Sequence, residues 1–239
     1  MAANGLSAGR QIAVAARWPG GVALTMWRYL WRTTPMHRSE VEGDPFEDQP
    51  PPLPAGFDRD RLQVPADGRG PLFHRLYRAR ISSSELSAEE LIGALRDDPD
   101  QAAPREFATF QKAAGADGRM IAGDEYVVRM AAPWDGPVRV VEAAECSFRL
   151  ATLDGHLEAG QIEFRAEEEG DVIVFEIESW ARSKDRITDV LYDRLHMTKE
   201  VQLHMWTSTL EGAGRMSGGR LGGGIEIRTR KVSEEDLCE

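Results

Sequence analysis

The central part of the chain alternates apolar and polar residues with the period of a β-strand. In residues 161–168 (QIEFRAEE), Ile162, Phe164 and Ala166 fall on one face, and charged or polar side chains fall on the other. Similar strand candidates are found at 124–130, 138–153 and 171–180. Turn-forming residues separate these segments at 133–137, 153–160 and 168–171. The pattern predicts an antiparallel sheet with one buried face and one wet face.

Residues 72–81 (LFHRLYRARI) alternate in the same way and are expected to open the sheet. The side chains that point to one side are Phe73, Arg75, Tyr77, Ala79 and Ile81. Two short helices are expected next. Ser87 and Glu90 form a capping-box pattern before the apolar run LIGAL, and Pro104 suits the first position of a helix in PREFATFQKA (104–113).

A long helix is predicted at 183–211, where apolar residues recur on one face. Acids and histidines, including His196 and His204, form a stripe opposite the apolar face, so they are expected to face water. Carboxylates and imidazoles at this spacing can bind a metal, but the segment has no H-E-x-x-H motif. We therefore expect no metal and no cofactor.

The element order predicts an α+β helix-grip fold, in which an antiparallel sheet wraps around the long C-terminal helix and leaves a cavity between them. Four regions are expected: an N-terminal helical arm at 1–42, a Pro-rich connector at 43–71, the helix-grip domain at 72–214, and a mobile, Gly-rich and acidic tail at 215–239. The aromatic segment of the arm is interpreted as a docking helix, with an interfacial membrane anchor as the alternative. The connector is interpreted as a stiff spacer.

Composition narrows the possible partners. The 239 residues carry a net charge of −11, and this acidic excess argues against nucleic acid or an anionic membrane as a partner. Two cysteines, Cys146 in a predicted strand and Cys238, do not make a disulfide framework, which fits a reducing cytoplasm. No secretory signal and no integral membrane segment is expected, because no apolar run approaches the roughly 20 residues that span a bilayer. The oligomeric state stays open.

The second half of the chain resembles a family of bacterial and plant proteins known as "domain of unknown function 1990". The motifs that carry the resemblance are RVVEA (139–143), LATLDGHLEAGQIEF (150–164), FEIESWARS (175–183) and Gln202. The departures are Leu150 and Ala151 for a Tyr-Gly pair, Gln161 for a glutamate, and ARSKD for Ser-Arg-Pro. The resemblance implies a START-like or Bet v 1-like fold. It implies no particular activity, because the family has none agreed.

Two sets of residues are candidate ligand-binding residues. His156 and Glu158 follow the hairpin signal DG, where His156 either anchors the corner of the hairpin or lies at the mouth of a pocket. Arg194, Thr198 and Gln202 are spaced at i, i+4 and i+8 within the apolar sector of the predicted helix. Polar groups there need partners, either from a ligand or from sheet acids such as Glu176 and Glu178. Trp180 is a further candidate, which either lines a pocket or fills the core.

These candidates allow three functions. The first is the binding of a hydrophobic or amphipathic small molecule in the cavity between sheet and helix. The second is a cyclase or aromatase type of enzyme on the same fold, which would need an ionisable pair inside the cavity. The third is a structural or partner-binding protein whose cavity is filled by its own side chains. The fold alone does not decide among them.

Overall fold

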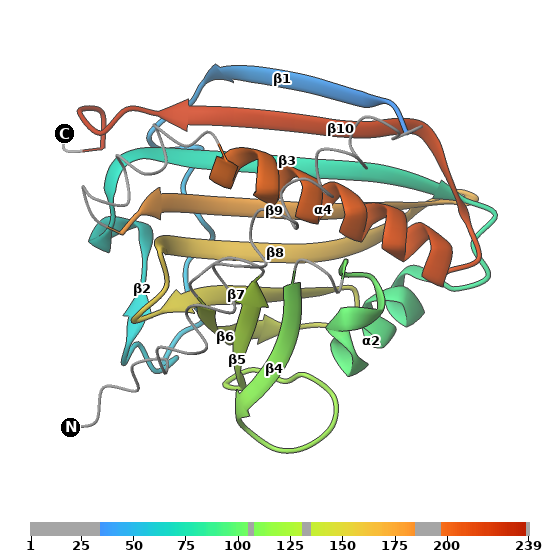
Figure 1. Ribbon diagram of the computed structural model, residues 1–239, viewed down its shortest axis with the longest axis horizontal. Coiled ribbons are helices and arrows are strands. Elements are labelled where there is room, and N and C mark those ends of the chain that lie inside the picture. Colours follow the sequence, from blue (N-terminus) through green and yellow to red (C-terminus); the bar gives the residue numbers. More distant parts are fainter. Residues whose placement is uncertain (1–33, 105–107, 131–134, 185–196, 238–239) are drawn as a thin grey trace, which may run out of the picture.

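A computed structural model describes residues 34–104, 108–130, 135–184 and 197–237 of the chain. Within these ranges the chain forms one ten-stranded sheet and two α-helices (Figure 1). The elements are β1 (Met36–Glu42), β2 (Leu62–Gln63), β3 (Arg69–Ser82), α2 (Ala88–Asp97), β4 (Ala108–Ala114), β5 (Glu125–Met130), β6 (Asp135–Ala143), β7 (Ser147–Leu153), β8 (Glu158–Glu169), β9 (Val172–Ser183), α4 (Met197–Met216) and β10 (Arg220–Val232).

The sheet has the strand order β1-β10-β3-β9-β8-β7-β6-β5-β4, and β2 pairs with β7 beside this path. All of these pairings are antiparallel except the one between β1 and β10. The hairpin predicted from DG joins β7 to β8, and Gly155 adopts the positive φ of 100° that glycine accepts at low cost. The predicted antiparallel sheet is therefore confirmed.

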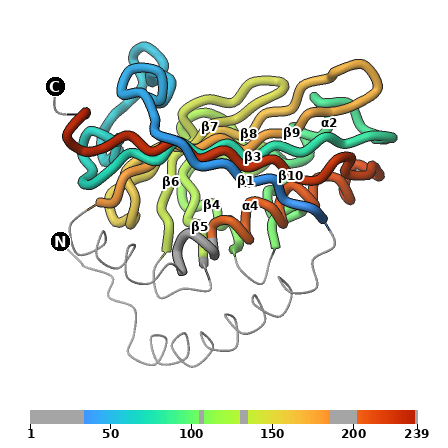
Figure 2. The backbone as a smooth tube through the Cα atoms, turned by 90° about the horizontal axis from the view of Figure 1, so that it is seen from above, coloured from blue at the N-terminus to red at the C-terminus, as the bar shows by residue number. Residues whose placement is uncertain are grey.

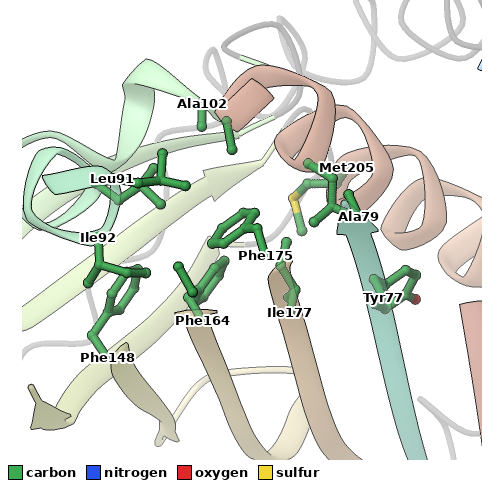
Figure 3. Packing of buried hydrophobic residues seen from close by; sticks show 14 of the residues in the cluster. Tyr77, Ala79, Leu91, Ile92, Ala102, Phe148, Phe164, Phe175, Ile177 and Met205 are labelled. Carbon is green, nitrogen blue, oxygen red and sulfur yellow. The ribbon is translucent and has the colours of Figure 1, made fainter. Parts of the chain in front are cut away.

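One face of the sheet carries the main hydrophobic core. Figure 3 shows Phe164, Phe175 and Ile177 pointing from the strands toward α2 and toward Met205 of α4. Figure 1 shows α4 crossing β3 and β9 on this face, with α2 beside it, and we call this the inner face. Helix α2 begins as predicted, because the Ser87 and Glu90 side chains form the reciprocal capping box with the backbone.

The opposite, outer face carries a network of charged residues. Arg78 and Arg165 both bind Glu176, and Arg165 also binds Glu178. His74 bonds Glu178 as well, with 2.6 Å between His74 Nε2 and Glu178 Oε1. Ion pairs between neighbouring strands therefore stabilise this part of the outer face.

The Pro-rich segment predicted as a spacer lies against this outer face. Figure 2 shows the chain between β1 and β3 on the other side of the sheet from α4. Arg149 donates to the carbonyl oxygens of Pro51 and Pro52 at 3.0 and 3.2 Å, and Gln161 donates to that of Pro51 at 3.3 Å. Asp48 is 1% exposed and accepts from His74. Residues 48–52 are therefore docked on the sheet, whereas the sequence was interpreted as a stiff spacer.

The predicted tail also belongs to the sheet, so the expectation that it is mobile is wrong. Strand β10 pairs with both β3 and β1. Gly223 and Gly224 have positive φ angles of 73° and 86° and lie where the register with β3 shifts, between Gly222 and Ile225. The glycines form an irregularity within a strand, after which Ile225 and Ile227 are buried in the core.

Two other expectations for local structure are corrected. Residues 108–114, expected to be helical, form β4, whose start is fixed where the Phe110 amide donates to Asp100 Oδ1 at 2.7 Å. Pairing with β5 overrides the helix propensity of this segment. Residues 138–153 form two strands rather than one, and Cys146 lies exposed in the turn between them.

The predicted N-terminal arm and the predicted long helix also differ from the structure. Residues 36–42 of the expected helical arm form strand β1, and the aromatic segment 22–32 lies outside the described residues. Within the described residues, the helix expected at 183–211 is α4 (Met197–Met216), and Ser183 belongs to β9. Residues 185–196 lie outside the described ranges.

Candidate functional site

Two of the predicted site residues meet on the inner face. Gln202, in the first part of α4, lies over the start of β8, and its Nε2 donates to Glu158 Oε1 at 2.8 Å. Glu158 is the first residue of β8 and is the register partner of Ser183 in β9. The two residues are 44 positions apart in sequence, so this contact ties the helix to the edge of the hairpin that precedes β8.

A third polar residue joins them from β3. Arg75 is 6% exposed, and its Nη1 donates to Gln202 Oε1 at 3.4 Å. The guanidinium carbon lies 4.5 Å from the centre of the Phe73 ring. The second terminal nitrogen, Nη2, is buried and has no hydrogen-bond partner among the residues that the structure describes. Arg75, Gln202 and Glu158 therefore form a buried or half-buried polar chain between sheet and helix, and one end of it is unsatisfied.

Arg75 was not among the residues singled out from the sequence. The signal was present in the alternation of residues 72–81, which places Arg75 on the same side as Tyr77, Ala79 and Ile81. These three residues are in the core, so the alternation is confirmed. A charged residue within a row of core residues requires a partner, and this requirement identifies Arg75.

His156 serves as the corner of the hairpin. Its Nδ1 accepts a hydrogen bond from the Glu158 backbone N–H at 2.9 Å, and burial lowers the pKa of its ring. Gln63 Nε2 donates to the carbonyl oxygens of His156 and Glu158 at 3.2 and 3.1 Å. The ring also lies close to β6, since a Cβ added at Gly136 would meet its Nε2 at 2.9 Å. The neutral imidazole therefore stabilises the turn through this hydrogen bond.

Trp180 lies on the other face of the sheet. It belongs to a second small cluster with Leu72 and Val232, and its ring stacks on His74 with 5.1 Å between the ring centres. The reason is the alternation along β9, in which Ile177 points into the main core and Trp180 points away from it. Trp180 is thus apart from Gln202 and Glu158.

The remaining predicted residues have different outcomes. Arg194 lies outside the described residues, and so does the side chain of Thr198. The sheet acids suggested as partners for Arg194, Glu176 and Glu178, are engaged by arginines on the outer face. His204, expected to face water, is only 6% exposed, because consecutive residues of α4 around it are buried and the helix is covered on more than one side.

An apolar cavity of about 20 Å³ lies between α2, α4 and the sheet. The residues that line it include Leu95, Phe110, Phe148, Phe164, Met205 and Trp206. Trp206 packs edge-on against Phe164, with 5.7 Å between the ring centres. A cavity of this size holds about one water molecule, so this part of the interior is filled by side chains.

The described part of the chain contains no candidate metal cluster and no membrane-spanning helix. Among those residues, no three histidine, cysteine, aspartate or glutamate side chains are grouped so that they could hold a metal ion. In the same part of the chain, neither helix has the length and apolar character needed to cross a membrane.

The fold is thus an antiparallel sheet with few helices, one of which packs on its inner face. Residues 43–208 match the family described as "Domain of unknown function (DUF1990)", and the chain belongs to that family. The resemblance predicted from the sequence motifs is confirmed. No curated protein matches the sequence significantly.

Several solved structures are similar to this chain in outline. Norcoclaurine synthase from Thalictrum flavum is 10% identical with a TM-score of 0.44, over 70% of this chain and 96% of that chain. The di-domain ARO/CYC protein StfQ of the steffimycin biosynthetic pathway is 11% identical with a TM-score of 0.45, over 64% and 52%. A conserved protein from Geobacillus kaustophilus is 8% identical with a TM-score of 0.43, over 62% and 98%. Similarity at this level does not identify a ligand or a reaction.

Proposed function

We propose that the protein binds a hydrophobic or amphipathic small molecule between the inner face of the sheet and α4, at the end where Arg75, Gln202 and Glu158 meet. The observation that supports this most strongly is the unsatisfied end of that polar chain, the buried Arg75 Nη2. A buried donor without a partner costs about 1–3 kcal/mol, and more for a charged group. A ligand acceptor would remove that cost.

The surroundings suit such a ligand. Phe73 lies under the Arg75 guanidinium, and Tyr77 and Ile177 continue the same face as part of the core. Small-molecule sites in proteins are mostly apolar, with a few polar groups that fix the orientation of the ligand. Gln202 supplies an amide and Glu158 a carboxylate beside the guanidinium, so the site has donors and an acceptor within one short chain.

The test is a titration with N-phenyl-1-naphthylamine, a neutral dye that fluoresces in apolar surroundings. The full chain is expected to bind the dye saturably, and Gln202→Trp is expected to lose that binding because the larger side chain occupies the site. Gln49→Trp is the matched control, since Gln49 is exposed and lies in the segment docked on the outer face. Equal binding to all three proteins would place the dye elsewhere and contradict the proposal.

A second candidate is a structural or partner-binding protein with a filled interior. The observation in its favour is the small volume of the apolar cavity, about 20 Å³. On that account Arg75 Nη2 bonds a buried water, and the full chain shows no saturable dye binding while it remains folded. Near-ultraviolet circular dichroism on the same samples verifies the fold.

A further inference from the structure

We propose that the small molecule carries a negatively charged head group, such as a carboxylate or sulfonate, and that Arg75 receives it. This inference rests on the proposed function and adds the chemical class of the ligand. The guanidinium presents a planar set of N–H donors that matches the oxygen atoms of an oxyanion, so a buried arginine without a carboxylate partner is suited to bind one.

Comparison with the other buried arginines supports the assignment. Four arginines are buried in the described part of the chain, and three of them bind a carboxylate at 2.6–3.2 Å: Arg139 binds Glu125, Arg149 binds Glu142 and Arg182 binds Glu234. Each of these three also donates to backbone carbonyl oxygens. Arg75 has the Gln202 amide oxygen instead, at 3.4 Å.

That single contact is weak. Ordinary N–H···O hydrogen bonds span about 2.7–3.2 Å, so the 3.4 Å between Arg75 Nη1 and Gln202 Oε1 lies at the limit. Charge-assisted bonds to an oxyanion are shorter and stronger than bonds to a neutral amide. A carboxylate or sulfonate oxygen would therefore compete successfully with the Gln202 amide and would also satisfy Nη2.

Further donors flank Arg75 on the sheet. Its register partners are Ser179 in β9 and Thr229 in β10, so two hydroxyl-bearing residues occupy the same row of the inner face. In the neighbouring row Phe73 pairs with Lys231, whose Nζ lies 5.9 Å from the centre of the Phe73 ring. The groups around Arg75 on β3, β9 and β10 are thus hydroxyls and a second cation.

Glu158 is the carboxylate at this site, and Gln202 separates it from Arg75. The Gln202 amide donates to Glu158 through Nε2 and accepts from Arg75 through Oε1. A ligand anion at Arg75 would be repelled by Glu158 across this amide. Replacing that carboxylate with an amide should therefore tighten the binding of an anion and leave a neutral molecule unaffected.

The experiment compares two dyes with the same ring system, 8-anilinonaphthalene-1-sulfonate and the neutral N-phenyl-1-naphthylamine. Wild type is expected to bind the sulfonate at least tenfold more tightly than the neutral dye. Arg75→Met should weaken the binding of the sulfonate at least tenfold and change the affinity for the neutral dye less than twofold. The control is Arg80→Met on the same strand, because Arg80 lies on the outer face in a half-exposed ion pair with Glu169.

Glu158→Gln is a second test that does not depend on the folding of Arg75→Met. It should tighten the binding of the sulfonate about threefold or more without changing the affinity for the neutral dye. If both dyes bind but Arg75→Met weakens them equally or not at all, the anionic head group is wrong and the small-molecule site stands. If neither dye binds folded wild type, both proposals fail. If Arg75→Met does not fold, the other two proteins still decide. The inference is overturned if wild type does not prefer the sulfonate, or if Glu158→Gln leaves the affinity for the sulfonate unchanged.

Discussion

His74 fixes the docked Pro-rich segment to the sheet, and its replacement by glutamine is expected to destabilise the protein. His74 Nδ1 lies 2.6 Å from Asp48 Oδ1, and Nε2 lies 2.6 Å from Glu178 Oε1. Both partners are acceptors when ionised, so both ring nitrogens donate and the imidazole is the charged form. Burial opposes this charge, but the hydrogen bonds to Glu178 and Asp48 outweigh it and raise the pKa of His74.

The magnitude follows from what the substitution leaves behind. The His74 side chain is 14% exposed and that of Asp48 only 1%, so the two charges are largely removed from water. Breaking a buried ion pair by removing one partner costs about 3–5 kcal/mol. Arg230 still binds Asp48 and Arg165 still binds Glu178, so we expect a loss near the lower limit, about 3 kcal/mol in the free energy of unfolding.

The pH dependence has a definite sign. Because the pKa of His74 is raised in the folded state, its contribution is fully present below the unfolded pKa of about 6.5 and is lost as the pH rises through the folded pKa. Each unit of difference between the folded and unfolded pKa contributes about 1.4 kcal/mol to the free energy of unfolding. Burial raises the pKa values of Asp48 and Glu178, but hydrogen bonds, with His74 first among them, lower them by more. Their contribution is therefore lost on acidification, below the unfolded carboxyl pKa of about 4.

The assay is urea unfolding of wild type and His74→Gln at pH values from 5 to 10, followed by tryptophan fluorescence. Wild type should lose stability between pH 6.5 and 10, and the variant should be nearly flat there. His37→Gln is the matched control, since His37 bonds a backbone carbonyl on the exposed surface and should keep the wild-type slope. The same slope in wild type and His74→Gln would refute the assignment of a charged, doubly bonded His74.

Four further substitutions, one of them a control, test the packing and the cap of α2 by urea unfolding. A Cβ at Gly160 would lie 2.1 Å from the Trp180 carbonyl oxygen, so Gly160→Ala should cost about 1–3 kcal/mol, while Gly222→Ala, whose nearest contact is 3.9 Å, should be close to neutral. Ser87→Ala removes the cap of α2 and should cost about 1 kcal/mol. Leu210→Ala on α4, at a side chain with 0% exposure, should cost about 2–5 kcal/mol, and a loss under about 0.5 kcal/mol would contradict its place in the core.

The sequence predicted the strands whose period of two is unbroken. The alternation in 161–168 and in 72–81 matches the inner and outer faces of β8 and β3, because a sheet with one buried face imposes that period on every strand it contains. The cap of α2 was predictable for a similar reason. Its hydrogen bonds are local, between Ser87 and Glu90, and do not depend on the rest of the fold.

Strands β4 and β10 were missed because their pairing is not local. Residues 108–114 contain good helix formers, and only the ladder with β5 makes them a strand. In 220–232 the glycines suggested a mobile tail, although IEIRTRKV after them alternates in the same way as β3, to which it pairs. The glycine content was given more weight than the alternation, although the alternation correctly indicated a strand.

The contrast between local patterns and non-local contacts also applies to the candidate site. Sequence patterns identified single residues of the site but not the contacts between them. Gln202 and Glu158 were singled out from spacing and from a hairpin signal, yet neither pattern shows that the two side chains touch. Trp180 lies apart from these two residues, because even-numbered residues of β9 face away from the helix. Arg75 was placed on the correct face but was not weighed as a buried charge. On a strand whose neighbouring inward residues Tyr77, Ala79 and Ile81 are core, a buried arginine is costly to leave without a partner, and the proposal of an anionic ligand rests on this cost.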